Sequence, residues 1–167
     1  MYFNWLNPKA QIQKVSDKGT GSFAQEIICQ GEIVASFGGF VVQTKDLNDF
    51  SQDRVSRSIQ ASQTSYILSG PKPEPGDMVN HSCNPNCGAI GISTIIAMKQ
   101  IEVGQEITFD YAMTDASPYD EFICFCGEVN CRKKITGNDW QLFEIQEKYK
   151  GFFNSNIEKL ILNSRKN

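Results

Sequence analysis

The sequence predicts a mainly β fold with few helices, followed by a helical C-terminal part. The first observation concerns residues 1–40, where short apolar segments alternate with glycines at the spacing of short strands joined by turns. The second concerns residues 136–167, where the pattern changes to that of two helices. A helix over 139–149 would end at Gly151, and a second helix is expected over 155–164.

The N-terminal half is expected to form short strands around a polar insert. Cys29 follows two isoleucines, so we expect a buried thiol there. The insert, residues 41–63, is rich in Ser, Gln, Asp and Asn and is expected to be irregular with one short helix. Strand character resumes at residues 66–68. Three prolines then stiffen an extended loop over 71–76, because proline fixes φ and biases its predecessor toward β.

Two further strands are expected at residues 92–98 and 106–111, with a turn between them. Side chains alternate between the two faces of a strand. Ile107, Phe109 and Tyr111 would therefore point the same way. The second strand would end in a tyrosine, which is most often a half-buried aromatic residue.

Composition limits the class of protein. The chain has 167 residues, 16 basic against 19 acidic, which suits one domain with a formal charge of −3. No Lys/Arg run supports nucleic-acid binding, whereas an acidic surface suits a basic peptide. Neither a secretion signal nor a membrane-length apolar run is visible. We expect an intracellular, cytoplasmic protein, with nuclear or host-delivered locations left open.

Three of the six cysteines, Cys124, Cys126 and Cys131, lie within eight residues. Thiolates at this spacing can converge on one tetrahedral zinc, which needs four ligands, and the alternative is three unrelated thiols. Cysteines clustered in this way fit a metal site in a reducing compartment better than a disulfide framework. The fourth ligand remains open among the other soft candidates, Cys29, His81, Cys83 and Cys87.

Residues 80–87 (NHSCNPNC) contain the chain's only histidine in a tight turn. Asn, Ser and Pro are usual turn residues, so a structural role is as well supported as a functional one. His81 suits either a core imidazole or a nucleophilic dyad with a cysteine, as in a hydrolase. Residues 18–21 (KGTG) lack the full pattern of a phosphate-binding loop, although their glycines permit a ligand to approach the backbone.

Taken in order, these motifs resemble a SET domain, the S-adenosylmethionine-dependent protein-lysine methyltransferase family, followed by a post-SET zinc motif. The resemblance covers roughly residues 10–135 and rests on residues 18–21, FGG at 37–39, Tyr66, NHSCNPNC at 80–87, EITFDY at 106–111 and the Cys-x-Cys-x4-Cys tail. It implies small curved β-sheets, with residues 80–83 threaded beneath a loop as a pseudoknot. It also implies a SET domain over 1–114, a post-SET segment over 115–135 and a C-terminal helical extension over 136–167.

The resemblance assigns roles to individual residues. Tyr111 matches the catalytic tyrosine, and Phe109 matches the position that limits how many methyl groups are added. Cys83 would complete the zinc site of Cys124, Cys126 and Cys131, which leaves Cys87 unassigned. S-adenosylmethionine would be held by Lys18, Gly19, Thr20, Gly21, Tyr66, Asn80 and His81.

The substrate implied is a protein or peptide with an accessible lysine, a basic tail being one candidate, and the product is up to di- or trimethyllysine. Two positions depart from the family pattern: Asp77 stands where many members carry arginine, and Phe40 replaces a commonly acidic residue. The alternative is a zinc-stabilised SET-like binding module with little catalytic activity. The resemblance does not indicate an oligomeric state.

Overall fold

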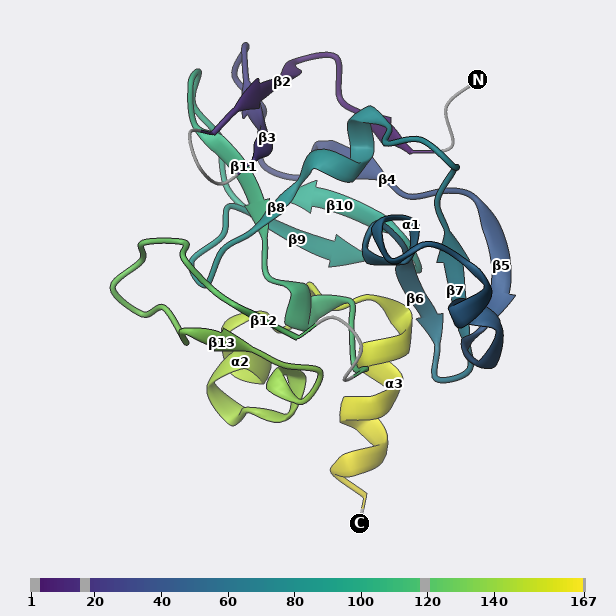
Figure 1. Cartoon of the computed structure of the whole chain (residues 1–167). Helices are drawn as coiled ribbons and strands as arrows, with labels where there is room; N and C mark the ends of the chain where they lie inside the picture. Colours follow the sequence, from purple (N-terminus) through teal and green to yellow (C-terminus); the bar gives the residue numbers. More distant parts are fainter. Residues whose placement is uncertain (1–3, 16–18, 118–120, 167) are drawn as a thin grey trace.

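The computed structural model describes residues 4–15, 19–117 and 121–166. Its central feature is an eight-stranded sheet in the order β1-β4-β10-β9-β11-β3-β2, with β8 paired to β11 (Figure 1). This arrangement confirms the mainly β prediction. The strands are β1 (Trp5–Leu6), β2 (Ala10–Lys14), β3 (Thr20–Ala24), β4 (Ile33–Ser36), β8 (Asn80–His81), β9 (Cys87–Ile90), β10 (Thr94–Ala97) and β11 (Glu106–Phe109).

The insert is more regular than expected. It forms a three-stranded sheet in the order β5-β7-β6, together with two helical segments. Leu47 and Val55 of the polar stretch pack with Tyr66 and Leu68 into a separate small core, against which the partly buried Val42 and Phe50 also pack. Apolar side chains spaced along the polar stretch thus give this segment a small core of its own. Its elements are β5 (Phe40–Gln43), the 3-10 helix η2 (Thr44–Asp49), α1 (Gln52–Ser56), β6 (Ile59–Ser62) and β7 (Ser65–Leu68).

Strand β11 lies at the centre of the sheet and determines the position of the site. It pairs antiparallel with β3 and parallel with β8, where Thr108 faces Asn80 and Phe109 faces His81. The predicted strand over 106–111 is too long, because Asp110 caps a 3-10 helix, η4 (Tyr111–Met113), by accepting a hydrogen bond from the Ala112 amide. Phe109 and Tyr111 nevertheless remain adjacent, with ring centroids 4.9 Å apart.

Two other local predictions are corrected. Cys29 is exposed, because backbone alternation directs its neighbour Ile28 into the core instead. The expected helix over 139–149 is broken at Leu142, whose backbone is extended (ψ 124°). It comprises the 3-10 helix η6 (Asp139–Gln141) and α2 (Phe143–Lys148), while the second helix, α3 (Ser155–Ser164), is confirmed at its predicted bounds.

The C-terminal helices pack beneath the central strands, and the short hairpin of β12 (Phe122–Ile123) and β13 (Lys134–Ile135) lies beside α2 (Figure 1). Tyr149, Phe153 and Ile157 belong to the same buried cluster as the strand residues. No helix in the described part of the chain is long and apolar enough to cross a membrane. The division at residues 114 and 135, and the pseudoknot, stay predictions.

Asn154 joins the C-terminal helices to the rest of the fold. Its side-chain oxygen accepts from the Ile157 amide and so caps α3, at 2.9 Å. Its amide nitrogen donates to the carbonyl oxygens of Gln60 at 3.0 Å and Thr114 at 3.3 Å. The residue is fully buried, so each of these partners would be left unsatisfied without it.

We expect Asn154→Ala to lower the free energy of unfolding by about 2 kcal/mol, through loss of the cap and of buried hydrogen bonds. Chemical denaturation measures this. The control is Asn163→Ala in the same helix, where the side chain is exposed and stability should hold or rise. Equal stability of the two variants would contradict the role given to Asn154.

Candidate active site

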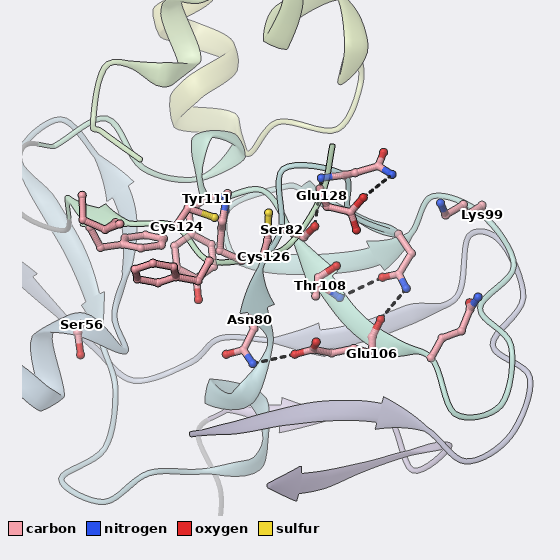
Figure 2. A pocket seen from close by; sticks show the side chains of 17 residues that line it. Ser56, Asn80, Ser82, Lys99, Glu106, Thr108, Tyr111, Cys124, Cys126 and Glu128 are labelled. Atoms are coloured by element: carbon pink, nitrogen blue, oxygen red, sulfur yellow. Dashed lines mark hydrogen bonds between the residues drawn. The ribbon is translucent and has the colours of Figure 1, made fainter. Parts of the chain in front are cut away.

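A cleft of about 790 Å³ lies between β8, β11 and the loop that follows β12. Figure 2 shows Ser56 and Lys99 at opposite ends of this cleft, with Asn80 and Glu106 along its base and Tyr111 beside Cys124 and Cys126. The lining residues are Ser56, Asn80, His81, Ser82, Asn84, Asn86, Lys99, Gln105, Glu106, Thr108, Tyr111, Phe122, Ile123, Cys124, Phe125, Cys126 and Glu128.

Asn80 is fixed at the base of the cleft by two hydrogen bonds. Its side-chain nitrogen donates to Glu106 Oε1 at 2.9 Å and to the Thr20 carbonyl at 3.0 Å. Gly21 makes this arrangement possible, because a Cβ there would lie 2.6 Å from Glu106 Oε1 and 2.8 Å from Asn80 Nδ2. Gly21 in β3 thus contributes to the cleft by leaving room for the Asn80 side chain.

Asn86 supports the strand beneath the cleft. Its side-chain nitrogen donates to the Glu106 carbonyl at 2.8 Å, and its oxygen accepts from the Thr108 amide at 3.0 Å. The amide side chain therefore acts as an additional strand partner for β11. Asn86 belongs to the NHSCNPNC turn. It has a structural role through these two hydrogen bonds, and it also lines the cleft.

His81 connects the tyrosine to the cysteines. Its Nδ1 accepts a hydrogen bond from the Tyr111 amide at 3.2 Å, and its Nε2 lies 3.4 Å from Cys83 Sγ. Burial lowers the pKa of His81 to about 4, so the imidazole is neutral at neutral pH. A neutral ring with Nδ1 as acceptor carries its proton on Nε2, toward the sulfur.

Tyr111 lies between two cavities. It lines the cleft and also a narrower cavity of about 50 Å³, which we call the side channel, and its hydroxyl donates to the Val79 carbonyl at 3.3 Å. Ser56 is the other residue common to both linings. The side channel is lined by Phe37, Ser56, Arg57, Ser58, Ile59, Gln60, Asp77, Val79, Phe109, Tyr111, Thr114 and Asp115.

Four thiols converge beside the cleft, and two of them, Cys124 and Cys126, line it. The sulfur atoms of Cys83, Cys124, Cys126 and Cys131 all lie within 4.8 Å of one another. This donor set suits a tetrahedral zinc, whose four sulfur ligands lie about 2.3 Å from the metal. Cys87 is buried in β9, outside this group, and Cys29 is exposed. Cys83 is only 1% exposed, which leaves little access for the substrate of a hydrolase.

An ion network, which sequence reasoning missed, holds the thiol segment in place. Arg132 donates to both oxygens of Asp110, at 2.6 and 2.7 Å, and its Nε donates to Asp139 at 2.7 Å. Burial disfavours the charged guanidinium, but the hydrogen bonds and charge of Asp110 outweigh it and raise the pKa of Arg132. The sequence does show an arginine directly after the last cysteine of the cluster. It does not show which distant carboxylates pair with that arginine.

The carbonyl of Cys83 ties the same region to the C-terminal extension. It accepts hydrogen bonds from the side chains of Asn130 at 2.9 Å, Lys148 at 3.0 Å and Tyr149 at 3.2 Å. Burial raises the pKa of the Cys83 thiol to about 11, so an ionised sulfur there requires a nearby cation.

The remaining predicted residues lie in different places. Lys18 falls outside the described residues. Gly19 adopts φ +87° directly before β3. The structure does not bring Tyr66 to the cleft, because its side chain is buried in the separate small core. Asp77, the departure from the family pattern, forms an ion pair with Arg57 at 3.0 Å.

The cleft and the side channel thus share Tyr111 in their linings, and Cys124 and Cys126 of the four-thiol cluster also line the cleft. The SET-domain family model matches residues 19–112, which is more than half of the chain. The chain belongs to the SET-domain family.

Curated relatives are named as histone-lysine methyltransferases. The chain is 26% identical over 150 residues to the probable histone-lysine N-methyltransferase set-23 of Caenorhabditis briggsae, covering 79% of this chain and 62% of that protein. It is 32% identical over 139 residues to the H3 lysine-36 specific histone-lysine N-methyltransferase of Mycosarcoma maydis, covering 75% of this chain and 14% of that protein. The chain therefore spans less than two thirds of either relative.

Solved structures agree on the fold. The crystal structure of KRYPTONITE in complex with mCHG DNA and SAH superposes with a TM-score of 0.63 at 25% identity, covering 77% of this chain and 29% of that one. A second KRYPTONITE complex, with mCHH DNA, an H3(1-15) peptide and SAH, gives a TM-score of 0.60 at 23% identity. Because DNA is present in both complexes, the expected absence of a nucleic-acid partner stays a prediction here.

Proposed function

We propose that this chain is an S-adenosylmethionine-dependent protein-lysine methyltransferase. The observation that carries the proposal is that Tyr111 lines both the cleft and the side channel. A methyl donor in the cleft and a lysine in the channel would meet at this one residue. Family membership and the names of the relatives support the same activity.

The cleft residues suit S-adenosylmethionine, which when bound supplies a methyl group on a positively charged sulfur. Glu106, Glu128 and the amide oxygens of Asn80 and Asn84 give the cleft many oxygen atoms. Phe122 and Phe125 add aromatic surface. A cationic ligand with an aromatic base matches this mixture of oxygens and rings.

The channel residues prepare the nucleophile. A free lysine has a pKa of about 10.4 and is protonated at neutral pH, whereas methyl transfer needs the neutral amine. Phe37, Phe109 and Val79 give the channel apolar walls, and desolvation there favours the uncharged form. Tyr111 then holds the amine in line, and alignment of this kind is worth effective molarities of about 10⁵ M or more.

A protein with a basic tail is the proposed substrate class. The mildly acidic chain, at formal charge −3, suits such a partner, and two relatives carry histone-lysine specificity in their names. Histone H3 is therefore the first probe to use with labelled S-adenosylmethionine. The proposed activity would be overturned if labelled methyl groups were transferred neither to a histone nor to a lysine of any protein in a fractionated lysate.

We expect Tyr111→Phe to reduce turnover about 100-fold, because the hydroxyl is lost from the point where the two cavities meet. Cofactor affinity should persist, since the cleft keeps its other residues. Transfer of labelled methyl groups measures the first quantity, and calorimetric titration with S-adenosylmethionine measures the second. Full turnover in the variant would remove the role assigned to Tyr111.

Phe109 is proposed to permit di- or trimethylation. A tyrosine at this position would hydrogen-bond the amine and crowd a methylated lysine, whereas phenylalanine leaves room. We expect mass spectrometry to show di- or trimethyllysine with the wild type and mainly monomethyllysine with Phe109→Tyr. Monomethyl product alone from the wild type, with every substrate tested, would count against this assignment.

Zinc is proposed to bind the four converging thiols and to hold the segment after β11 against the cleft. We expect the purified chain to contain one zinc ion, and Cys124→Ser to lose both the metal and thermal stability. Metal analysis and thermal unfolding measure these. The control is Cys29→Ser, whose exposed thiol lies outside the cluster. Full zinc content in Cys124→Ser would refute the proposed ligand set.

A further inference from the structure

Two carboxylates line the side channel, and they differ in what surrounds them. Asp77 is fully engaged: Arg57 forms an ion pair with it, the Glu74 amide donates to it at 2.7 Å, and the side chains of Asn4 and Ser69 also bond to it. Asp115 has no ion-pair partner among the described residues. It is therefore the channel carboxylate whose charge is not already balanced.

Asp115 is held in a defined position by its neighbours. Its Oδ1 accepts from the Ser117 amide at 2.7 Å and from the Ser117 hydroxyl at 2.8 Å, so Ser117 does not use Oδ2. Its own amide donates to the Tyr111 carbonyl at 3.0 Å. The next residue, Ala116, donates its amide to Gln60 Oε1 at 2.8 Å, which links this turn to β6. The carboxylate is thus fixed relative to both Tyr111 and the insert.

The other side of this turn is fixed by close packing. A Cβ added to Gly137 would lie 2.0 Å from the Ser117 carbonyl oxygen, so only glycine allows the two backbones to approach this closely. Gly137 follows the thiol segment in sequence. The turn that presents Asp115 is consequently held between the insert and the C-terminal extension, and the position of the carboxylate is preorganised.

The surroundings of Asp115 favour a cation that arrives from outside. The residue is half-buried, and burial raises the pKa of its carboxyl group above the usual range. A carboxylate out of bulk water and without a cation is unfavourable, and a positive group placed beside it relieves this cost. The channel also has aromatic walls, from Phe37, Phe109 and Tyr111, which suit an aliphatic chain.

We propose that Asp115 is a specificity-determining residue that binds the ammonium group of the substrate lysine as this side chain enters the channel. The inference rests on the proposed methyltransferase function and adds to it the group that recognises the substrate's charge. An ion pair with Asp115 keeps lysine protonated, so the ammonium group must leave Asp115 and release its proton to solvent before the neutral amine accepts the methyl group at Tyr111. Asp115 therefore contributes to substrate capture and not to the chemical step.

The first test is steady-state methylation of histone H3 by the wild type and by Asp115→Asn. Asparagine keeps an oxygen that can accept from Ser117, so the turn is retained while the charge is lost. We expect KM for H3 to rise about tenfold with kcat unchanged, as for loss of a charge-assisted hydrogen bond. Asp115→Glu should recover part of the loss. The matched control, Asp49→Asn, removes an exposed carboxylate outside both cavities and should leave KM unchanged.

An unchanged KM in Asp115→Asn would overturn the proposal, as would a loss confined to kcat. A second measurement does not depend on turnover: NMR titration with n-butylammonium, which reproduces the lysine chain and its charge, with uncharged n-butanol as the comparison. We expect the ammonium to bind the wild type more tightly than Asp115→Asn, and the alcohol to bind both alike. Equal ammonium binding refutes the role of Asp115 even if H3 proves not to be a substrate, whereas absent methylation alone concerns the proposed function.

Discussion

The buried ion pair between Asp110 and Arg132 is the interaction on which the site most depends. Asp110 is inaccessible to solvent and lies between the last residue of β11 and Tyr111. Arg132 follows the last thiol of the cluster and also binds Asp139 in the C-terminal extension. One guanidinium thus joins the strand, the thiol segment and the extension. Removing one partner of such a pair leaves an unbalanced buried charge, which is far costlier than losing a surface ion pair.

The site is assembled from segments that are distant in sequence, and each contributes a wall or a support. The insert supplies one side of the side channel, the strand β11 supplies Phe109, and the residues after it supply Tyr111. Within residues 136–166, the C-terminal extension contributes no lining residue to the cleft or to the side channel. Asn154 and Tyr149 nevertheless bind the backbone of segments that line them. These hydrogen bonds tie the extension to the walls of both cavities.

The sequence predicted the parts of the site that are encoded in short motifs. Three such motifs are short enough to be read from neighbouring residues: the NHSCNPNC turn, the tyrosine after β11 and the three clustered cysteines. The structure brings these three motifs together. The errors were at element ends and at contacts between distant segments. The Asp110 cap ended the strand early, backbone alternation exposed Cys29, and the partners of Arg132 depend on tertiary packing that no local pattern encodes.

The parallel pairing of β8 with β11 has a consequence for how this protein folds. Asn80 faces Thr108, so the two strands meet only after the intervening β9–β10 hairpin has closed a long loop. Non-local pairing of this kind slows folding, because the entropy of loop closure is lost before the contacts form. The pairing that brings His81 beside Tyr111 is therefore expected to form later than the local hairpins.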